Sequence, residues 1–204
     1  MTKPKKHNKE QLYNIAESQQ GYFTTKQAKA FGYPNNTHSY HVQTGHWVRE
    51  HRGIYRLRNF PVSDQSDFVL WSLWSKNRKE IPQGVFSHQT ALSVYELSDI
   101  MPTKVHMTVP KSFRRNSAVP SVLILHYGEL ASADVEQMQG FRVTRPLRTL
   151  FDLVKTGEVP REILYAALAE ALQRGLITRR EIEEQEKEGR DMNRIRELLN
   201  GIKK

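Results

Sequence analysis

Ser87 and His88 are neighbouring residues of the types that form a hydroxyl nucleophile and its general base. Direct activation is awkward for this pair, because adjacent residues at the start of a helix point in different directions. The alternative is structural, since Ser87 stands immediately before the helical pattern HQTALSVYEL, where serine is a typical N-cap. We favour the cap and predict no catalytic residue, and both side chains are kept as candidates for a site in this half of the chain.

A second group of charged side chains lies in VTRPLRTLFDLV, residues 143–154. Arg148 and Asp152 have the i, i+4 spacing of an ion pair on one helix face. Arg145 and Arg148 could instead bind a phosphate group. A nuclease would need acidic residues with a lysine on strands, but the later carboxylates lie in charged helical stretches, and no glycine-rich phosphate loop is present. We therefore expect no enzyme, no cofactor and no metal.

Polar side chains dominate NNTHSYHVQT, residues 35–44, and they are of the types that can hydrogen-bond to base edges. Val42 faces the core, and His38 and His41 have the spacing of core positions. Three interpretations of these histidines stay open: packed rings, groove-facing rings, or a metal pair with no identifiable third ligand. One broad side of the helix carries Asn36, Thr37, Ser39, Tyr40, Gln43 and Thr44.

The elements around this stretch are those that would place it in a groove. A helix is expected over 8–19, followed by a short helix over 25–31 that begins with a capping box formed by Thr24 and Gln27. Pro34 separates it from a third helix, capped by Asn35 or Asn36. The stretch HWVREHRGIYRL then predicts a β-hairpin around Gly53. This order is that of a winged helix-turn-helix.

Two further groups of residues are predicted to contact DNA. The start of the second helix carries Thr24, Thr25 and Lys26. The hairpin tip carries Arg49, His51 and Arg52, which suit the minor groove or phosphates, although an ordinary charged tip is the alternative.

The rest of the chain predicts a second domain. A linker is expected over 61–67, then an apolar helix, then strands within 84–87, 104–110, 121–128 and 141–146, of which 121–128 is expected to be buried. Helices are expected from Pro146 to the C-terminus. The predicted class is α+β: a winged helix-turn-helix over 1–60, then a mixed α/β domain over 66–204 that ends in helices.

Charge is concentrated at the start of the chain. Residues 1–60 hold 10 Lys+Arg and 3 Asp+Glu, a balance of +7, which leaves +2 of the total +9 for the remainder. Such a segment can attract a polyanion, although a solvated basic surface is the alternative. Cysteine is absent, residues 1–7 are expected to be disordered, and no apolar run is long enough to span a bilayer. These features predict a soluble, cytoplasmic protein without a membrane partner.

Four stretches resemble the AbiEi antitoxin family of type IV toxin–antitoxin systems: YFTTKQAKAFGY, TGHWVREHRGIYRL, FSHQTALSVYEL and VTRPLRTLFDLV. The resemblance implies a winged helix that represses its own operon through double-stranded DNA, often at inverted repeats. It also implies an antitoxin domain, for which Ser87, His88, Arg145, Arg148 and Asp152 are the candidates. The toxin would be a nucleotidyltransferase-like protein that need not form a stable complex with the antitoxin.

Two departures from the family pattern keep alternatives open. The helix over 35–44 contains no arginine, and its histidines stand where the family has aliphatic residues. The chain could therefore be a protein-interaction module that no longer reads DNA. An enzyme that acts on the toxin is the remaining alternative.

Overall fold

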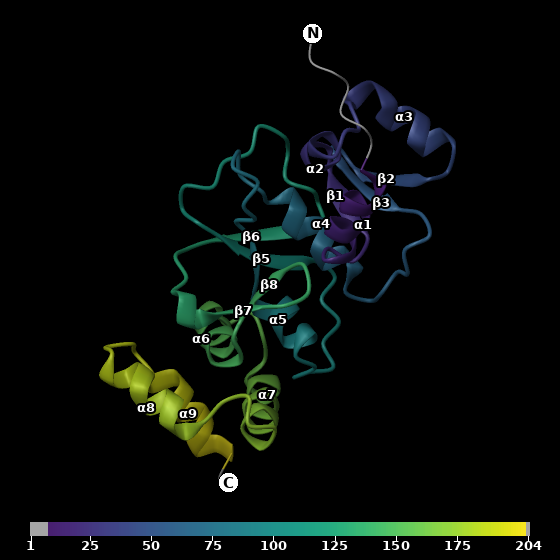
Figure 1. Ribbon diagram of the computed structural model, residues 1–204. Helices are drawn as coiled ribbons and strands as arrows, with labels where there is room; N and C mark the ends of the chain where they lie inside the picture. Colours follow the sequence, from purple (N-terminus) through teal and green to yellow (C-terminus); the bar gives the residue numbers. More distant parts are fainter. Residues whose placement is uncertain (1–7, 203–204) are drawn as a thin grey trace. The chain divides into compact units, whose positions relative to one another are not determined.

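The computed structural model describes residues 8–202 of the chain, so the predicted disorder of residues 1–7 falls outside it. Within that range there are nine α-helices, one short 3-10 helix and two β-sheets (Figure 1). The described residues pack into two compact units. The first contains the chain through Gly84 together with Gln137–Phe141, and the second contains Val85–Glu136 and the chain from Arg142 onward. The functional boundaries predicted above, 1–60 and 66–204, stay a prediction.

The first unit begins with three helices and a three-stranded sheet. The helices are α1 (Lys9–Glu17), α2 (Thr25–Ala30) and α3 (Asn35–Gln43), and the strands are β1 (Tyr22–Thr24), β2 (Trp47–His51) and β3 (Ile54–Leu57). The predicted order of three helices and a hairpin is confirmed. The sheet has the order β1-β3-β2 with antiparallel pairing, in which Phe23 lies opposite Tyr55. Strand β1 was not predicted, because three residues are too few to show a period.

Aromatic rings fill the core of this unit. Phe23 is fully buried and packs edge-on against Trp47, with ring centroids 4.8 Å apart. Leu12 and Ala16 of α1 complete this core, as their helical spacing predicts. Helix α4 (Ser66–Trp74) also belongs to the first unit and buries most of its length.

The segment Gln137–Phe141 is joined to the first unit by side-chain and backbone contacts. The ring of Phe141 lies 5.3 Å from that of Phe68. The side-chain amide of Gln20 donates a hydrogen bond to the carbonyl of Gln139, with 3.0 Å between N and O. Residues far apart in the sequence therefore build one core.

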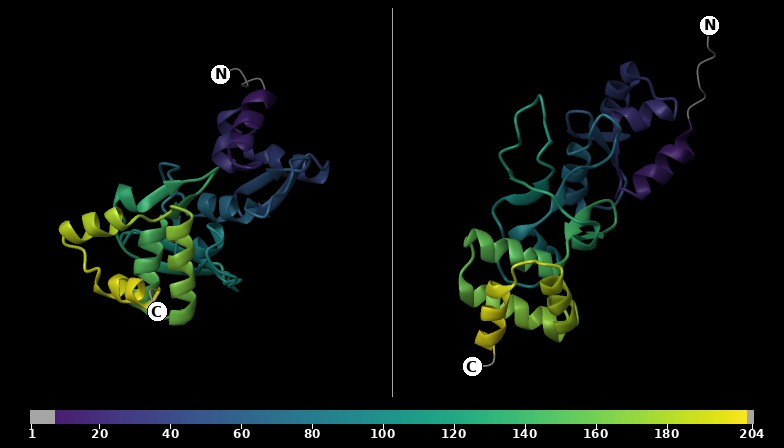
Figure 2. Two further views of the ribbon diagram at one scale, coloured as in Figure 1. Left: turned by 90° about the horizontal axis from the view of Figure 1, so that it is seen from below. Right: turned by 90° about the vertical axis from the view of Figure 1, so that its left-hand side faces the viewer.

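The second unit is built on a five-stranded mixed sheet with the order β6-β5-β4-β8-β7. The pairs β5–β6 and β4–β8 are parallel, and β4–β5 is antiparallel. Figure 2 shows the C-terminal helices, green to yellow, lying together. The strands are β4 (Val85–Phe86), β5 (Val105–Val109), β6 (Leu123–Tyr127), β7 (Val135–Gln137) and β8 (Arg142–Thr144), and the helices are α5 (His88–Val94), α6 (Pro146–Thr156), α7 (Arg161–Gln173), α8 (Arg179–Lys187) and α9 (Asn193–Ile202).

Local signals placed several helix ends correctly. The capping box of α2 is present, with Thr24 and Gln27 satisfying each other's backbone amides. Pro146 begins α6, and Gly157 ends it in the left-handed conformation with φ of 68°.

Two local predictions were wrong. Pro34, not an asparagine, is the N-cap of α3, and it provides no side-chain cap. The strand expected to be buried, β6, is an edge strand in which only Leu123 is buried. The three residues after Leu123 are half-buried, and Tyr127 at the end of the strand is exposed.

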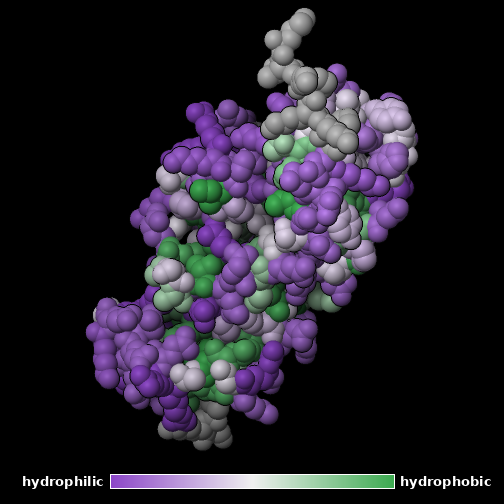
Figure 3. All heavy atoms as spheres, in the orientation of Figure 1, coloured by the Kyte–Doolittle hydropathy of each residue, from purple (hydrophilic) through white to green (hydrophobic). Residues whose placement is uncertain are grey.

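The surface of the molecule is mainly hydrophilic on the face drawn in Figure 3, with hydrophobic atoms in small separate patches. Over residues 8–202 no helix combines the length and apolarity required to cross a membrane.

Candidate nucleic-acid interface

Helix α3 presents a polar face to solvent. Asn36, Ser39, Tyr40 and Gln43 are exposed, and the Tyr40 side chain is 60% exposed. Thr37 is half-buried, and its hydroxyl donates a hydrogen bond to the carbonyl of Pro34 at 2.8 Å. The exposed side chains could reach base edges, because none of them is needed to fill the core.

The opposite face of α3 is held in the core by its two histidines. His38 is 3% exposed, and its Nε2 donates to the carbonyl oxygen of Tyr33 at 2.9 Å, which fixes the tautomer because a carbonyl can only accept. The ring of His41 stacks on Trp47 with centroids 4.5 Å apart. Of the three interpretations, both histidines are packed rings, and they replace the aliphatic residues that such a helix would otherwise bury.

The start of α2 faces the protein more than the solvent. Thr24 is buried, and its hydroxyl accepts from the amide of Gln27 at 3.3 Å while it donates to Glu80 at 3.2 Å. The hydroxyl of Thr25 donates to the carbonyl of Gly53 at 3.3 Å. Lys26 is exposed but forms an ion pair with Glu80 at 2.9 Å, which offsets part of its charge. Of the three, Lys26 has the most accessible side chain.

The hairpin tip carries two exposed cations. Arg49 and Arg52 are exposed, and within residues 8–202 neither forms an ion pair. Arg56 is different, because it pairs with Glu50 across the hairpin at 2.8 Å. The ring of His51 is half-buried and lies 5.9 Å from that of Trp71. The tip can therefore place two guanidinium groups against phosphates, whereas His51 faces inward.

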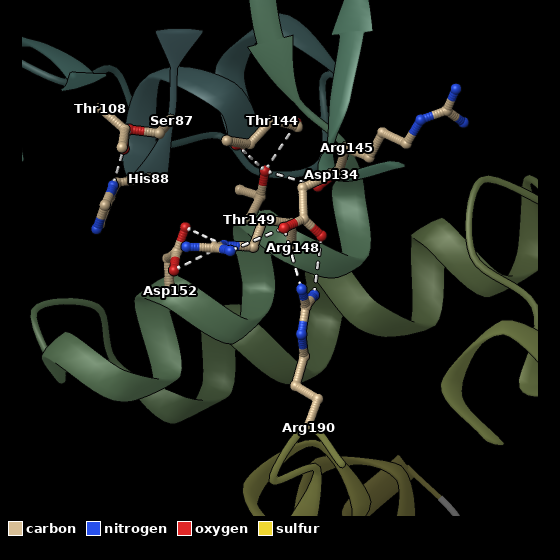
Figure 4. Close-up of polar contacts among 10 residues, drawn as sticks. All are labelled: Ser87, His88, Thr108, Asp134, Thr144, Arg145, Arg148, Thr149, Asp152 and Arg190. Atoms are coloured by element: carbon tan, nitrogen blue, oxygen red, sulfur yellow. Dashed lines mark hydrogen bonds and ion pairs between the residues drawn. The ribbon is translucent and has the colours of Figure 1, made fainter. Parts of the chain in front are cut away.

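The second unit places Ser87 and His88 in direct contact, against expectation. Ser87 is at the N-cap position of α5, yet its hydroxyl caps no backbone amide. It accepts from the Thr108 hydroxyl at 2.8 Å and lies 2.9 Å from Nδ1 of His88 (Figure 4). The contact is possible because His88 has a left-handed backbone with φ of 54°, which turns its side chain back toward Ser87. Both residues are buried, so this hydrogen-bond chain is closed to solvent.

His88 is also part of a stack of imidazoles. Its ring lies parallel to that of His126 with centroids 3.6 Å apart, and Nδ1 of His106 lies 3.0 Å from Nε2 of His126. Burial lowers the pKa of His88 to about 3, with smaller contributions from His126, His106 and Arg148. The pKa values of the other two rings are lowered for the same reason. Within the described part of the chain, no three His, Asp or Glu side chains, this stack included, are arranged to hold a metal ion.

An ion-pair network joins three segments of the second unit. The predicted pair of Arg148 and Asp152 is present at 2.9 Å, and Arg148 also contacts Asp134 at 2.9 Å. Arg190 binds the same Asp134 with both terminal nitrogens, at 2.9 and 3.0 Å (Figure 4). Burial alone would raise the pKa of Asp134, but the two guanidinium groups outweigh it and lower that pKa.

This network decides how the predicted arginines are used. Arg148 is committed to two carboxylates, and Arg145 points away from it (Figure 4). The two arginines do not converge on a common phosphate. Asp134 and Arg190 were missed by sequence reasoning, because 56 residues separate them and neither stands in a recognisable motif.

One known family matches part of the first unit. Residues 10–58 match the family described as "Transcriptional regulator, AbiEi antitoxin". No curated protein sequence matches the chain. The matched residues begin within α1 and end directly after β3, so they contain the polar face of α3 and the hairpin tip. The resemblance inferred from the sequence is therefore confirmed over this segment.

Proposed function

We propose that this AbiEi-type antitoxin regulator binds double-stranded DNA through a winged helix-turn-helix, with α3 in the major groove. The observation that carries the proposal is the division of α3 into two faces. Its exposed side holds Asn36, Ser39 and Gln43, while His38 and His41 anchor the other side in the core. A reading helix needs this arrangement, because its base contacts require rigid support from behind.

Electrostatics supports the same interface. The first 60 residues carry +7 of the net charge of +9. Arg49 and Arg52 extend this charge to the hairpin tip, where phosphate contacts would fix the register of α3 on the duplex. Each phosphate that the protein neutralises releases counterions, so DNA binding is expected to weaken steeply as salt rises.

The regulatory role proposed is repression of the protein's own operon, at an inverted-repeat operator read by two copies of the first unit. We assign DNA binding to residues 1–60 and antitoxicity to residues 66–204, acting in the cytoplasm against a nucleotidyltransferase-like toxin. The matching family of antitoxin regulators supports this assignment. The buried Ser87–His88 pair and the fully committed Arg148 favour a structural role in the second domain over an enzymatic one.

A gel-shift titration on the DNA upstream of the gene tests the proposal, with scrambled DNA as competitor at two salt concentrations. We expect specific, salt-sensitive binding that is lost in the double variant Ser39→Ala/Gln43→Ala. Gln173→Ala is the matched control, because Gln173 is an exposed glutamine at the end of α7 in the other unit. Equal affinity for scrambled DNA would refute sequence reading by α3.

One observation favours a second function, a protein-interaction module. Helix α3 contains neither lysine nor arginine, although most base-reading helices use arginine for guanine. In that case the double variant would leave operon expression unchanged, and the exposed Tyr40 would be a contact for a protein partner.

A further inference from the structure

A pocket of about 450 Å³ lies within the first unit, on the side of α3 away from its exposed polar face. Its lining comes from α1, from Tyr33 before α3, from α3 itself and the segment that leads into β2, and from the end of β3 with residues 59–61. The volume is in the range of sites that hold small molecules. All of the lining residues belong to one compact unit, so the pocket does not depend on how the two units are placed.

The walls of the pocket are mainly aromatic. Tyr33, His41 and Trp47 form one continuous group of rings, with centroid separations of 5.2 Å for Tyr33–His41 and 4.5 Å for His41–Trp47. Tyr13 and Phe60 supply further rings, 6.5 Å apart. Flat π-faces at several angles favour a planar ring, which can stack on one face and meet the edge of another.

The pocket lining contains a positive charge and no negative charge. Lys9 contributes an ammonium group, and His46 and Asn59 contribute exposed polar groups. None of the twelve lining residues is a carboxylate. Lys9 forms no ion pair within residues 8–202. A cation at the rim of an aromatic pocket that has no acid of its own complements an anion.

We propose that this pocket binds a small planar aromatic anion, such as an aromatic carboxylate. The ring lies against the more accessible Tyr13 and Phe60, because Trp47 is only 3% exposed and packs in the core, and the carboxylate pairs with Lys9. Trp47 is also the residue on which His41 of α3 stacks, so the ligand is seated directly behind the helix that carries the polar face. The proposal rests on the pocket alone and does not require that α3 reads DNA.

The test is isothermal titration of the full-length chain, without DNA, using 2-naphthoate and its neutral analogue 2-naphthalenemethanol. For molecules of this size we expect one site with a Kd of about 1 mM or below for naphthoate. Lys9→Gln should weaken naphthoate by about threefold and leave the neutral analogue unchanged, as for a solvent-exposed ion pair. Tyr13→Ala should weaken both compounds by about fivefold through loss of a ring contact.

Two control variants distinguish binding in the pocket from non-specific binding to lysine or tyrosine side chains elsewhere on the surface. Lys29→Gln removes an exposed lysine outside the pocket, and Tyr127→Ala removes an exposed tyrosine of the other unit. Both should bind naphthoate like the parent chain. Absence of saturable binding by the parent chain would overturn the proposal, and so would parental affinity for naphthoate in both Lys9→Gln and Tyr13→Ala.

Two other occupants have distinct signatures. Binding that occurs only after deletion of residues 2–7 would show that the chain's own N-terminus fills the pocket. Binding that occurs only under conditions that dissociate an oligomer would assign the pocket to a second copy. Either result would overturn the small-molecule proposal, and neither bears on DNA binding, which the gel shift measures separately.

Discussion

The backbone amide of Thr25 donates a hydrogen bond to the carbonyl of Gly53, with 2.9 Å between nitrogen and oxygen. The hydroxyl of Thr25 donates to the same carbonyl at 3.3 Å. The first residue of α2 therefore holds the turn of the hairpin. Because Arg52 directly precedes Gly53, this contact positions the cations at the tip relative to the helices.

The first prediction concerns the backbone at two glycines. Gly53 has φ of 80° and its added Cβ would meet only the Thr25 hydroxyl at 3.6 Å, whereas at Gly21, with φ of 89°, a Cβ would lie 2.6 Å from the ring of Phe60. Gly53→Ala should cost about 1–2 kcal/mol of unfolding free energy from backbone strain alone. Gly21→Ala should cost more, and thermal denaturation will compare them. Equal losses would show that the Phe60 contact relaxes freely.

The second prediction separates phosphate contacts from base contacts. Arg49→Gln and Arg52→Gln should each weaken DNA binding for all sequences alike and reduce the salt slope by about 1. Gln43→Ala should instead change the preference between operator and scrambled DNA. Fluorescence anisotropy at several salt concentrations measures the salt slope and the preference for operator over scrambled DNA. Arg180→Gln, at an exposed position of α8, is the control and should change neither. An unchanged salt slope in both tip variants would remove the tip from the interface.

The third prediction is a loss of stability in acid. The pKa of His88 is lowered from 6.5 to about 3, so between these values the unfolded chain binds a proton that the folded chain does not. Stability is therefore full above pH 6.5 and falls as pH decreases toward 3, by up to about 1.4 kcal/mol per pH unit for each such histidine. His106 and His126 add to this slope, because their pKa values are also lowered.

Urea denaturation at a series of pH values between 7 and 4 measures this slope. His88→Asn should flatten it, since asparagine tolerates the positive φ and does not titrate in this range. Gln173→Asn, at an exposed position whose side chain does not titrate, is the control that should leave the slope as it is. A parental stability that is constant over this interval would contradict burial of a neutral imidazole stack.

The fourth prediction concerns Asp134, whose carboxylate forms ion pairs with Arg148 and Arg190. Asp134→Asn leaves Arg190 without its carboxylate and Arg148 with only Asp152, so it should cost about 3 kcal/mol, as for a broken buried pair. Glu184→Gln breaks the exposed pair of Glu184 with Arg180 and should leave the denaturation midpoint nearly unchanged, because solvent screens a pair at the surface. Chemical denaturation compares the two variants. A small loss for Asp134→Asn would mean that water replaces the carboxylate.

Sequence reasoning was successful where short-range rules decide the structure. The helix starts at Thr24 and Pro146 follow from side-chain capping and ring geometry, both of which act within a few residues. The order of the helices and of the strands other than β1 and β7 followed from apolar periodicity and turn residues. The polar face of α3 could be assigned in the same way, whereas the spacing of His38 and His41 left open whether they pack, and the structure shows both rings packed.

The features that the sequence did not predict depend on contacts between residues that are distant in the sequence. Ser87 fits an N-cap by local rules, but its hydroxyl is taken by Thr108 on another strand. Strand β1 exists because β3 is available to pair with it. The imidazole stack joins residues of α5, β5 and β6, and no local pattern brings them together.

The placement of Gln137–Phe141 has a consequence for recombination. Because this segment folds with the first unit, the chain passes between the two units three times, after Gly84, after Glu136 and after Phe141. A gene fusion with one junction near residue 84 would transfer the polar face of α3 without the Phe141 ring that packs on Phe68. Exchange of an intact first unit between relatives would therefore need both pieces from the same parent, so evolution can shuffle these two units less freely than a linear arrangement of domains would allow.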